Sequence, residues 1–266
     1  MRYFRLVRPQ GIPAAFSVFW GPSVMSEVVV QPCRGKNEPQ LPACGLLLVN
    51  PFEARQAAQL TGQNGWTRHF LFHSNLHLAQ TPPMFWAGPA VGAPMAVICL
   101  EKLIALGARR IIVCGWCGSL QADLGLGELV LPARGISEEG TSDHYPVAGA
   151  VESSPRLRQA LKDFFAGTGK EPREGVIWTT DALYRETREK VVRYGKAGIL
   201  AVDMECSALM QVAAFRRIEL AAVMMVSDLL WQDPWQPAFQ SKDFRRRSQG
   251  LVADLVQCVT TLTATE

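Results

Sequence analysis

The stretch that decides the fold runs Gly198-Ile-Leu-Ala-Val-Asp-Met-Glu-Cys-Ser-Ala-Leu209 and continues, after a short interval, as Ala221-Ala-Val-Met-Met-Val-Ser-Asp228. Its apolar run from Ala221 to Val226 is short enough to be a buried strand, and Asp228 follows it directly. Asp203 and Glu205 stand at the start of a helical segment. Acids at the ends of secondary structure elements are often placed for chemistry, but they also complement helix N-termini and begin turns. Both interpretations are open from these residues alone.

Composition limits the classes of function. The chain has 266 residues, 48% of them hydrophobic and 19% charged, which is typical of a globular protein with one large α/β domain or two small ones. A net charge of +3 does not indicate nucleic-acid binding. The basic runs Arg109-Arg110 and Arg245–Arg247 are short, and we interpret them as solvated helix faces. No apolar run reaches the roughly 18 residues of a membrane helix, so neither nucleic acid nor membrane is expected as a partner.

The cysteines indicate a reducing environment. There are seven, an odd number without regular spacing, which favours free thiols and a cytoplasmic location over a disulfide framework. Cys114-Gly-Trp-Cys117 has the thioredoxin spacing, but a reactive cysteine of that type opens a helix, and the segment that follows is broken by glycines. No second cysteine pair accompanies it, so we predict neither a redox centre nor a metal site.

Hydrophobic patterning predicts strands alternating with helices, the arrangement of parallel crossovers in an α/β sheet. The predicted strands are 45–50, 66–72, 84–88, 110–115, 128–132, 175–181 and, in the opening stretch, one before Asp203 and one at 221–226. The clearest helices begin at Pro51, before Val97, at Ser153, after Asp203 and before Val252. Glycines follow two of these strands, in Gly88-Pro-Ala-Val-Gly92 and in a predicted turn, Gly115-Trp-Cys-Gly118. There they either make plain turns or let backbone amides approach a ligand. With no repeat or linker, we expect one domain over residues 43–266 and an irregular arm, residues 1–42, packed on it.

Several motifs occur together in a characteristic order. They are Gly88-Pro-Ala-Val-Gly92, Leu106-Gly-Ala-Arg-Arg-Ile-Ile-Val-Cys-Gly-Trp-Cys-Gly-Ser119, Leu124-Gly-Leu-Gly-Glu-Leu-Val-Leu-Pro132, Thr179-Thr-Asp-Ala-Leu-Tyr184, Asp203-Met-Glu-Cys-Ser-Ala208 and Val226-Ser-Asp228. Over residues 45–262 the ordered set resembles the family of purine nucleoside phosphorylases, uridine phosphorylases and methylthioadenosine/S-adenosylhomocysteine nucleosidases. The resemblance implies a three-layer α/β/α sandwich around a mixed central sheet.

The resemblance also implies roles for individual residues. Met204 and Glu205 match the pair that holds the ribose, a role suited to a carboxylate that accepts from neighbouring hydroxyls. Asp228 matches the acid that protonates or hydrogen-bonds the departing base. The implied base pocket consists of Trp116, Cys117, Gly118, Tyr184, Asp203 and Ser227. Uridine phosphorylases carry a Gln and an Arg after the Tyr184 position; because Arg185-Glu-Thr-Arg-Glu189 lacks that pattern, a purine-type base is favoured.

The acceptor of the ribosyl group is less clearly indicated. Family phosphorylases bind phosphate through a glycine and an arginine after the first strand, an arginine on the strand before Gly115, a hydroxyl near it, and an arginine from a neighbouring subunit. Here the glycine of the first loop is missing and Arg55 is displaced, Val113 or Cys114 replaces the strand arginine, and Trp116 replaces the small residue inside the turn. Arg68 alone stands where the neighbour's arginine is expected.

Two sets of alternatives follow from the resemblance. Retained Arg68 favours phosphorolysis to free base and ribose 1-phosphate, with inorganic phosphate as co-substrate and no other cofactor. The alternatives are hydrolysis with Glu53 activating water, uridine phosphorolysis, and a nucleoside-binding relative without catalytic activity. Because Arg68 would complete a neighbour's site, a homodimer or an assembly of dimers is expected.

Overall fold

The computed structural model describes residues 28–62 and 65–264. The chain divides into Met1–Gln31 and Pro32–Glu266, and the second unit holds every helix and strand named below. The predicted N-terminal arm, residues 1–42, therefore falls largely outside the described residues, and its packing on the domain stays a prediction.

Ten strands of the described residues form one sheet, joined by helices in the alternating order that the sequence predicts. The strands are β1 (Cys44–Leu48), β2 (Trp66–Leu71), β3 (Ser74–Gln80), β4 (Pro83–Gly88), β5 (Arg110–Ser119), β6 (Leu129–Glu138), β7 (Arg173–Thr180), β8 (Ala201–Asp203), β9 (Glu219–Leu229) and β10 (Gln236–Pro237). The α-helices are α1 (Pro51–Thr61), α2 (Ala93–Ala105), α3 (Pro155–Ala166), α4 (Arg188–Lys196), α5 (Cys206–Arg216) and α6 (Lys242–Ala264), and the short 3₁₀ helices are η2 (Ser142–His144) and η3 (Leu183–Arg185).

The sheet is mixed, as expected, and part of it closes on itself. Its order is β10-β9-β6-β7-β8-β5-β1-β4-β3-β2, with an additional pairing of β9 to β5. Strands β4, β1, β5 and β9 are parallel neighbours, whereas β8 pairs antiparallel to β5 and β6 pairs antiparallel to β9. The extra pairing joins β5, β9, β6, β7 and β8 into a closed circuit. The carboxyl ends of β1, β5 and β9 consequently meet at one edge, where parallel sheets commonly bind ligands.

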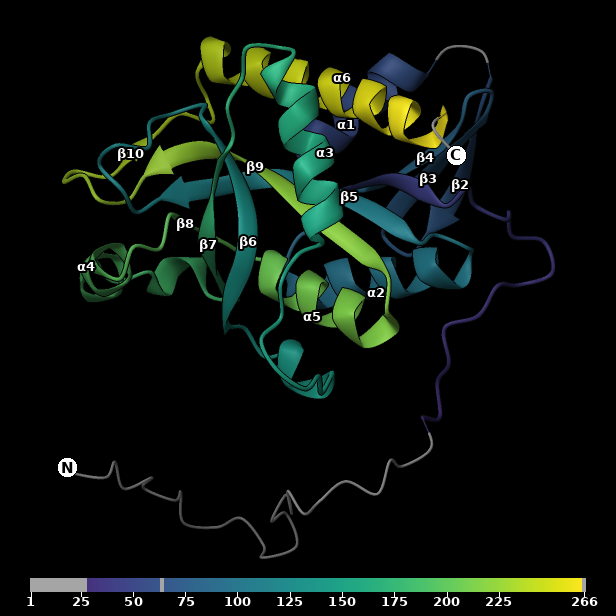
Figure 1. The fold of residues 1–266 in the computed structure, drawn as a ribbon, viewed down its shortest axis with the longest axis horizontal. Helices are drawn as coiled ribbons and strands as arrows, with labels where there is room; N and C mark the ends of the chain where they lie inside the picture. Colours follow the sequence, from purple (N-terminus) through teal and green to yellow (C-terminus); the bar gives the residue numbers. More distant parts are fainter. Residues whose placement is uncertain (1–27, 63–64, 265–266) are drawn as a thin grey trace, which may run out of the picture. The chain divides into compact units, whose positions relative to one another are not determined.

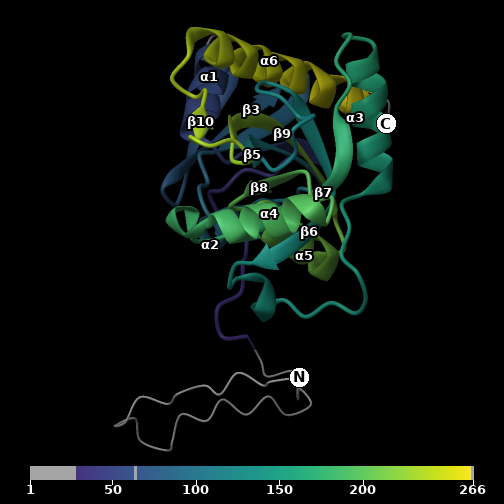
Figure 2. The same ribbon diagram turned by 90° about the vertical axis from the view of Figure 1, so that its left-hand side faces the viewer.

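Helices cover both faces of the sheet (Figure 1). Helices α2 and α5 bury Leu100 and Leu209 in one hydrophobic core, and α3 and α6 bury Leu161 and Leu255 in another, which α1 shares. These two cores confirm the three-layer α/β/α arrangement. A third, small core lies beside β7 and β8, where Val191 of α4 packs (Figure 2).

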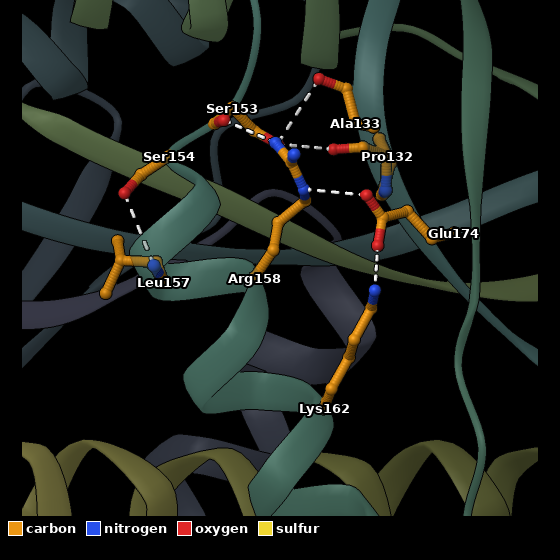
Figure 3. Close-up of polar contacts among 8 residues, drawn as sticks. All are labelled: Pro132, Ala133, Ser153, Ser154, Leu157, Arg158, Lys162 and Glu174. Atoms are coloured by element: carbon orange, nitrogen blue, oxygen red, sulfur yellow. Dashed lines mark hydrogen bonds and ion pairs between the residues drawn. The ribbon is translucent and has the colours of Figure 1, made fainter.

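Polar contacts fix α3 to the amino end of β7 (Figure 3). The Ser154 hydroxyl caps the helix by accepting from the Leu157 N–H at 3.3 Å. One turn further on, Arg158 Nε donates to Glu174 Oε1 at 3.0 Å, and Lys162 forms an ion pair with the same carboxylate. Ser153 donates to the Pro132 carbonyl oxygen at 2.7 Å. This network stabilises the outer layer and leaves the opposite edge of the sheet free for other groups.

The structure corrects some local predictions. The predicted turn Gly115–Gly118 is wrong: β5 continues through Ser119, with Trp116 opposite Met225 of β9. Arg110 is buried in β5 rather than on a solvated helix face. Strands β3 and β10 and helix α4 have no counterpart among the predicted elements. None of the described helices is long and apolar enough to cross a membrane.

Candidate active site

A cavity of about 510 Å³ opens where β1, β5, β8 and β9 end. Residues from all four strand ends contribute to its lining. The predicted site residues that line it are Trp116, Cys117, Gly118, Tyr184, Asp203, Met204, Glu205, Ser227 and Asp228. The other predicted residues, Glu53, Arg55 and Arg68, do not line it. The structure thus gathers the residues predicted to hold the nucleoside and separates them from those predicted to bind or activate the acceptor.

Glu205 is held at one side of the cavity by the backbone of a glycine. The Gly92 N–H donates to Glu205 Oε1 at 2.6 Å, and Gly92 adopts a φ of 81°, a conformation that favours glycine. Burial raises the pKa of the Glu205 carboxyl, and the nearby Asp203 carboxylate raises it further, against the Gly92 hydrogen bond. A carboxyl group with one oxygen fixed in this way can present its other oxygen to ribose hydroxyls.

Asp203 has a structural role at the start of α5. Its Oδ2 accepts from the N–H groups of Glu205 at 3.2 Å and Cys206 at 2.7 Å, while the Thr179 hydroxyl donates to Oδ1 at 2.6 Å. Helix N-termini need such acceptors for their free N–H groups. Asp203 also lines the cavity, and its contacts with the N–H groups of Glu205 and Cys206 fix the backbone from which the Glu205 side chain projects.

Asp228 also lines the cavity, near the end of β9 and opposite Gly118 of β5. Ser227 Oγ donates to Asp228 Oδ1 at 2.6 Å, and Trp235 Nε1 donates to Oδ2 at 2.8 Å. A Cβ at position 118 would lie 3.1 Å from Asp228 Oδ2 and only 2.4 Å from the Leu230 side chain. Gly118 is therefore required for the close approach of β5 to this carboxylate.

Glu186 is a cavity residue that sequence reasoning missed. It follows η3, is partly buried, and lines the cavity together with Asp228, whereas neighbouring Tyr184 is 97% exposed at the rim. Burial raises the pKa of Glu186 to about 8, and the Asp228 carboxylate contributes, against an opposing effect of Lys190. The available signal was its position two residues after Tyr184, inside the segment Arg185–Glu189 that lacks the uridine phosphorylase pattern.

Trp116 occupies the other end of the cavity, on the face of β5 directed toward α1 and α6. Its ring packs against Phe52, with centroids 5.8 Å apart, and edge-on against Phe244 at 5.0 Å. Trp116 Nε1 donates to Ser248 Oγ at 3.2 Å, and that hydroxyl donates to Glu53 Oε1 at 3.2 Å. The aromatic cluster fills the region next to the cavity on this side.

Glu53 lies within the protein, on α1. It is fully buried, and its Oε2 has no hydrogen-bond partner among the described residues. Burial raises the pKa of Glu53 to about 7, and hydrogen bonds from Cys114 and Ser248 offset this only in part. Glu53 is consequently a buried group near the cavity rather than a residue of its lining.

The cavity is lined by acids and by no described basic side chain. Its ionisable residues, cysteine apart, are Tyr184, Glu186, Asp203, Glu205 and Asp228. Arg55 is exposed on α1, and Arg68 is exposed on β2, which forms an edge of the sheet. The single chain therefore brings no arginine into the lining of this cavity.

Cys114 and Cys117 lie within a strand, not at the start of a helix. Both are buried, and burial raises the pKa of each thiol well above its usual value. This environment opposes thiolate formation, in agreement with the sequence-based choice against a redox centre.

The sequence pattern of the phosphorylase superfamily matches residues 44–260. The chain therefore belongs to this superfamily. It is 31% identical over 141 residues to a guanosine phosphorylase of Halorubrum lacusprofundi, covering 51% of this chain and 57% of that protein. It is 32% identical over 147 residues to a DeoD-type purine nucleoside phosphorylase of Caldanaerobacter subterraneus, covering 54% and 63%. The chain spans about six-tenths of the length of these curated relatives.

Solved structures share the fold. The purine nucleoside phosphorylase of Toxoplasma gondii, solved with immucillin-H, superposes with a TM-score of 0.74 at 21% identity, covering 85% of this chain and 94% of that one. A uridine phosphorylase of Vibrio fischeri superposes with a TM-score of 0.72 at 22% identity, covering 84% and 92%. These similarities confirm the nucleoside phosphorylase-like fold of the described domain.

Proposed function

We propose that the protein cleaves the N-ribosidic bond of a purine-type nucleoside, with water as the acceptor. The observation that carries this proposal is the shared cavity, which is lined both by Glu205, which follows β8, and by Asp228 of β9, supported by Ser227 and Trp235; β8 and β9 pair with β5 at the same residue, Gly118. A nucleoside has hydroxyl donors at one end and ring nitrogens and N–H groups at the other. These two carboxyl groups match that polarity, Glu205 toward the ribose and Asp228 toward the base.

The chemistry of the bond explains why carboxyl groups are useful at both ends. As the bond breaks, positive oxocarbenium character develops on the ribose and negative charge develops on the base, as in glycoside hydrolysis. Acceptor oxygens near the ribose and a positioned proton donor near the base favour that charge separation. A well-placed donor accelerates such a reaction by about 10² to 10⁴.

Water is favoured over phosphate because of the charges of the cavity. A phosphate dianion is bound in proteins by arginine, lysine or converging N–H groups. The described lining offers acids and no arginine, lysine or histidine, and it includes the large side chain of Trp116. Water needs no such positive charge.

Phosphorolysis is the second candidate, and one observation favours it. Arg68 is exposed on the edge strand β2, where it is available to a neighbouring copy. Phe70, on the same strand, is 83% exposed, as suits a strand that packs against a second subunit. This candidate requires a homodimer or an assembly of dimers. Light scattering that gives the monomer mass under assay conditions would reject it.

A nucleoside panel tests the proposal. Adenosine, inosine, guanosine, methylthioadenosine and uridine are incubated with the protein in phosphate-free buffer and in buffer with phosphate, and released base and sugar are measured. We expect purine release with ribose as the sugar product in both buffers. Ribose 1-phosphate formation, abolished by Arg68→Gln, would support the second candidate. Binding without turnover in either buffer would reject both and leave a nucleoside-binding protein.

A further inference from the structure

The base end of the cavity holds two carboxyl groups, Asp228 and Glu186. Glu186 lines both the main cavity and an adjoining hollow of about 360 Å³, and Asp228 and Trp235 also line both. The two acids come from β9 and from the turn before α4, so tertiary packing alone brings them together. A base bound beside Asp228 would therefore meet Glu186 as well.

The two carboxyl groups differ in their hydrogen bonding. Each oxygen of Asp228 already accepts a hydrogen bond, one from Ser227 and one from Trp235. Donors of this kind stabilise the ionised form of a carboxyl group. The Glu186 carboxyl has no hydrogen-bond partner anywhere in the described part of the chain. Both oxygens of Asp228 are thus engaged as hydrogen-bond acceptors, whereas the Glu186 carboxyl group remains available to donate to a bound base.

The charged groups around Glu186 do not reverse this difference. Lys190 of α4 favours the ionised form of Glu186, but Lys190 Nζ is paired with Glu138 at 2.6 Å. Arg188, which lines the adjoining hollow, directs its guanidinium to the carbonyl oxygens of Leu230 at 2.6 Å and Gln232 at 2.8 Å. Burial and the Asp228 carboxylate raise the pKa of Glu186 to about 8. Near neutral pH its carboxyl group therefore carries a proton.

We propose that Glu186, rather than Asp228, is the catalytic acid that protonates the departing base, while Asp228 accepts a hydrogen bond from the base and orients it. This inference rests on the proposed function. The C1′–N bond breaks with its electron pair moving to the base, and the Glu186 proton moves to a ring nitrogen of the base. The oxygen of water forms the new bond to C1′ and releases its proton to solvent. Glu186 is left as a carboxylate and regains a proton from solvent after the base departs.

Glu186→Gln tests the assignment, because an amide keeps the size and a hydrogen-bond donor but cannot transfer a proton. The control is Glu189→Gln, which changes an exposed glutamate three residues further along, outside the cavity lining. Both variants are assayed with the best purine nucleoside of the panel and with p-nitrophenyl β-D-riboside. The latter's nitrophenolate departs without protonation. We expect Glu186→Gln to lower kcat by about 10² to 10⁴ with the nucleoside and to leave turnover of the nitrophenyl riboside nearly unchanged.

The pH dependence of kcat gives an independent readout. Because the acid must be protonated, wild-type kcat should fall as pH rises through about 8, and Glu186→Gln should lack that decline. A merely structural role would affect both substrates alike and would not remove the decline. The assignment is overturned if Glu186→Gln behaves like the Glu189→Gln control, if it slows both substrates equally, or if Asp228→Asn alone removes the alkaline decline. A wild type that cleaves no nucleoside rejects the proposed function itself.

Discussion

The two ends of the cavity differ in how their side chains are packed and hydrogen-bonded. At the base end, Asp228 is held by Ser227 and Trp235 and faces open space. At the opposite end, Trp116 is packed between Phe52 and Phe244 above the buried pair of Ser248 and Glu53. The first arrangement places its carboxyl group in the lining of the cavity, whereas the second buries its carboxyl group outside that lining. Residues of the base end should therefore govern activity, and those of the opposite end should govern stability.

Apart from Glu186→Gln, Asp228→Asn should show the largest effect, and it tests the base end. The amide nitrogen cannot accept from the base, and it directs a donor toward either Ser227 or Trp235. We expect kcat/KM for the preferred nucleoside to fall by about 10² to 10³, which corresponds to about 3 to 4 kcal/mol of transition-state stabilisation. Asp233→Asn, on an exposed residue of the following loop, is the control and should retain wild-type kcat/KM. Equal activity of the two variants would show that Asp228 does not contact the base.

Much of the architecture behind this comparison could be predicted from the sequence. Short apolar runs identify β1, β4, β5 and β9, because buried parallel strands are poor in polar residues. Glu205 and Asp228 were candidates because each follows an apolar run, and their predicted roles came from the family resemblance. Helix α4 could not be predicted from the sequence, because its residues are mostly charged, it contains Gly195, and only Val191 is buried. Its position depends on the small core beside β7 and β8.

The unpredicted parts of the site depend on tertiary contacts. Glu186 enters the cavity because η3 and α4 turn the chain there, and no local pattern marks it. Trp116 was assigned to a turn because two glycines flank it, yet pairing with β9 keeps the strand extended through Ser119. That pairing, together with strand alternation, places Trp116 on the same face as Cys114 and directs it toward α6.

Two tryptophans, one at each end, sharpen the comparison. Trp116 packs in the core shared by α1 and α6, and Trp116→Ala should lower the free energy of unfolding by about 2 to 4 kcal/mol, somewhat less than for a fully buried aromatic residue. Trp235 is 51% exposed, and Trp235→Ala should cost less than about 1 kcal/mol of stability while lowering kcat/KM through the lost bond to Asp228. Urea denaturation and steady-state kinetics on both variants measure the contrast. Similar losses of unfolding free energy in Trp116→Ala and Trp235→Ala would contradict this contrast.

Glu53→Gln should change how stability depends on pH. Because burial raises the pKa of Glu53 to about 7 from an ordinary value of 4.5, the folded protein holds a proton that the unfolded chain releases. Its contribution to stability is full below pH 4.5 and is lost as pH rises through about 7. Between pH 5 and pH 8 this group should reduce the free energy of unfolding by about 2.5 kcal/mol. Urea denaturation of Glu53→Gln at a series of pH values should lack this decline in the free energy of unfolding. An unchanged decline would show that Glu53 titrates normally.

Ser248→Ala should have the smallest effect, since it removes one hydroxyl that links Trp116 to Glu53. The Trp116 N–H loses its acceptor and Glu53 Oε1 loses a donor, which together should cost about 1 to 2 kcal/mol of unfolding free energy. Loss of a donor also disfavours the Glu53 carboxylate, so the pH-dependent decline in stability should move to higher pH. Nucleoside kcat/KM should remain near the wild-type value, because Ser248 does not line the cavity. If Ser248→Ala instead reduces activity without reducing stability, the hydrogen-bonded pair beneath Trp116 takes part in catalysis, and the division between the two ends fails.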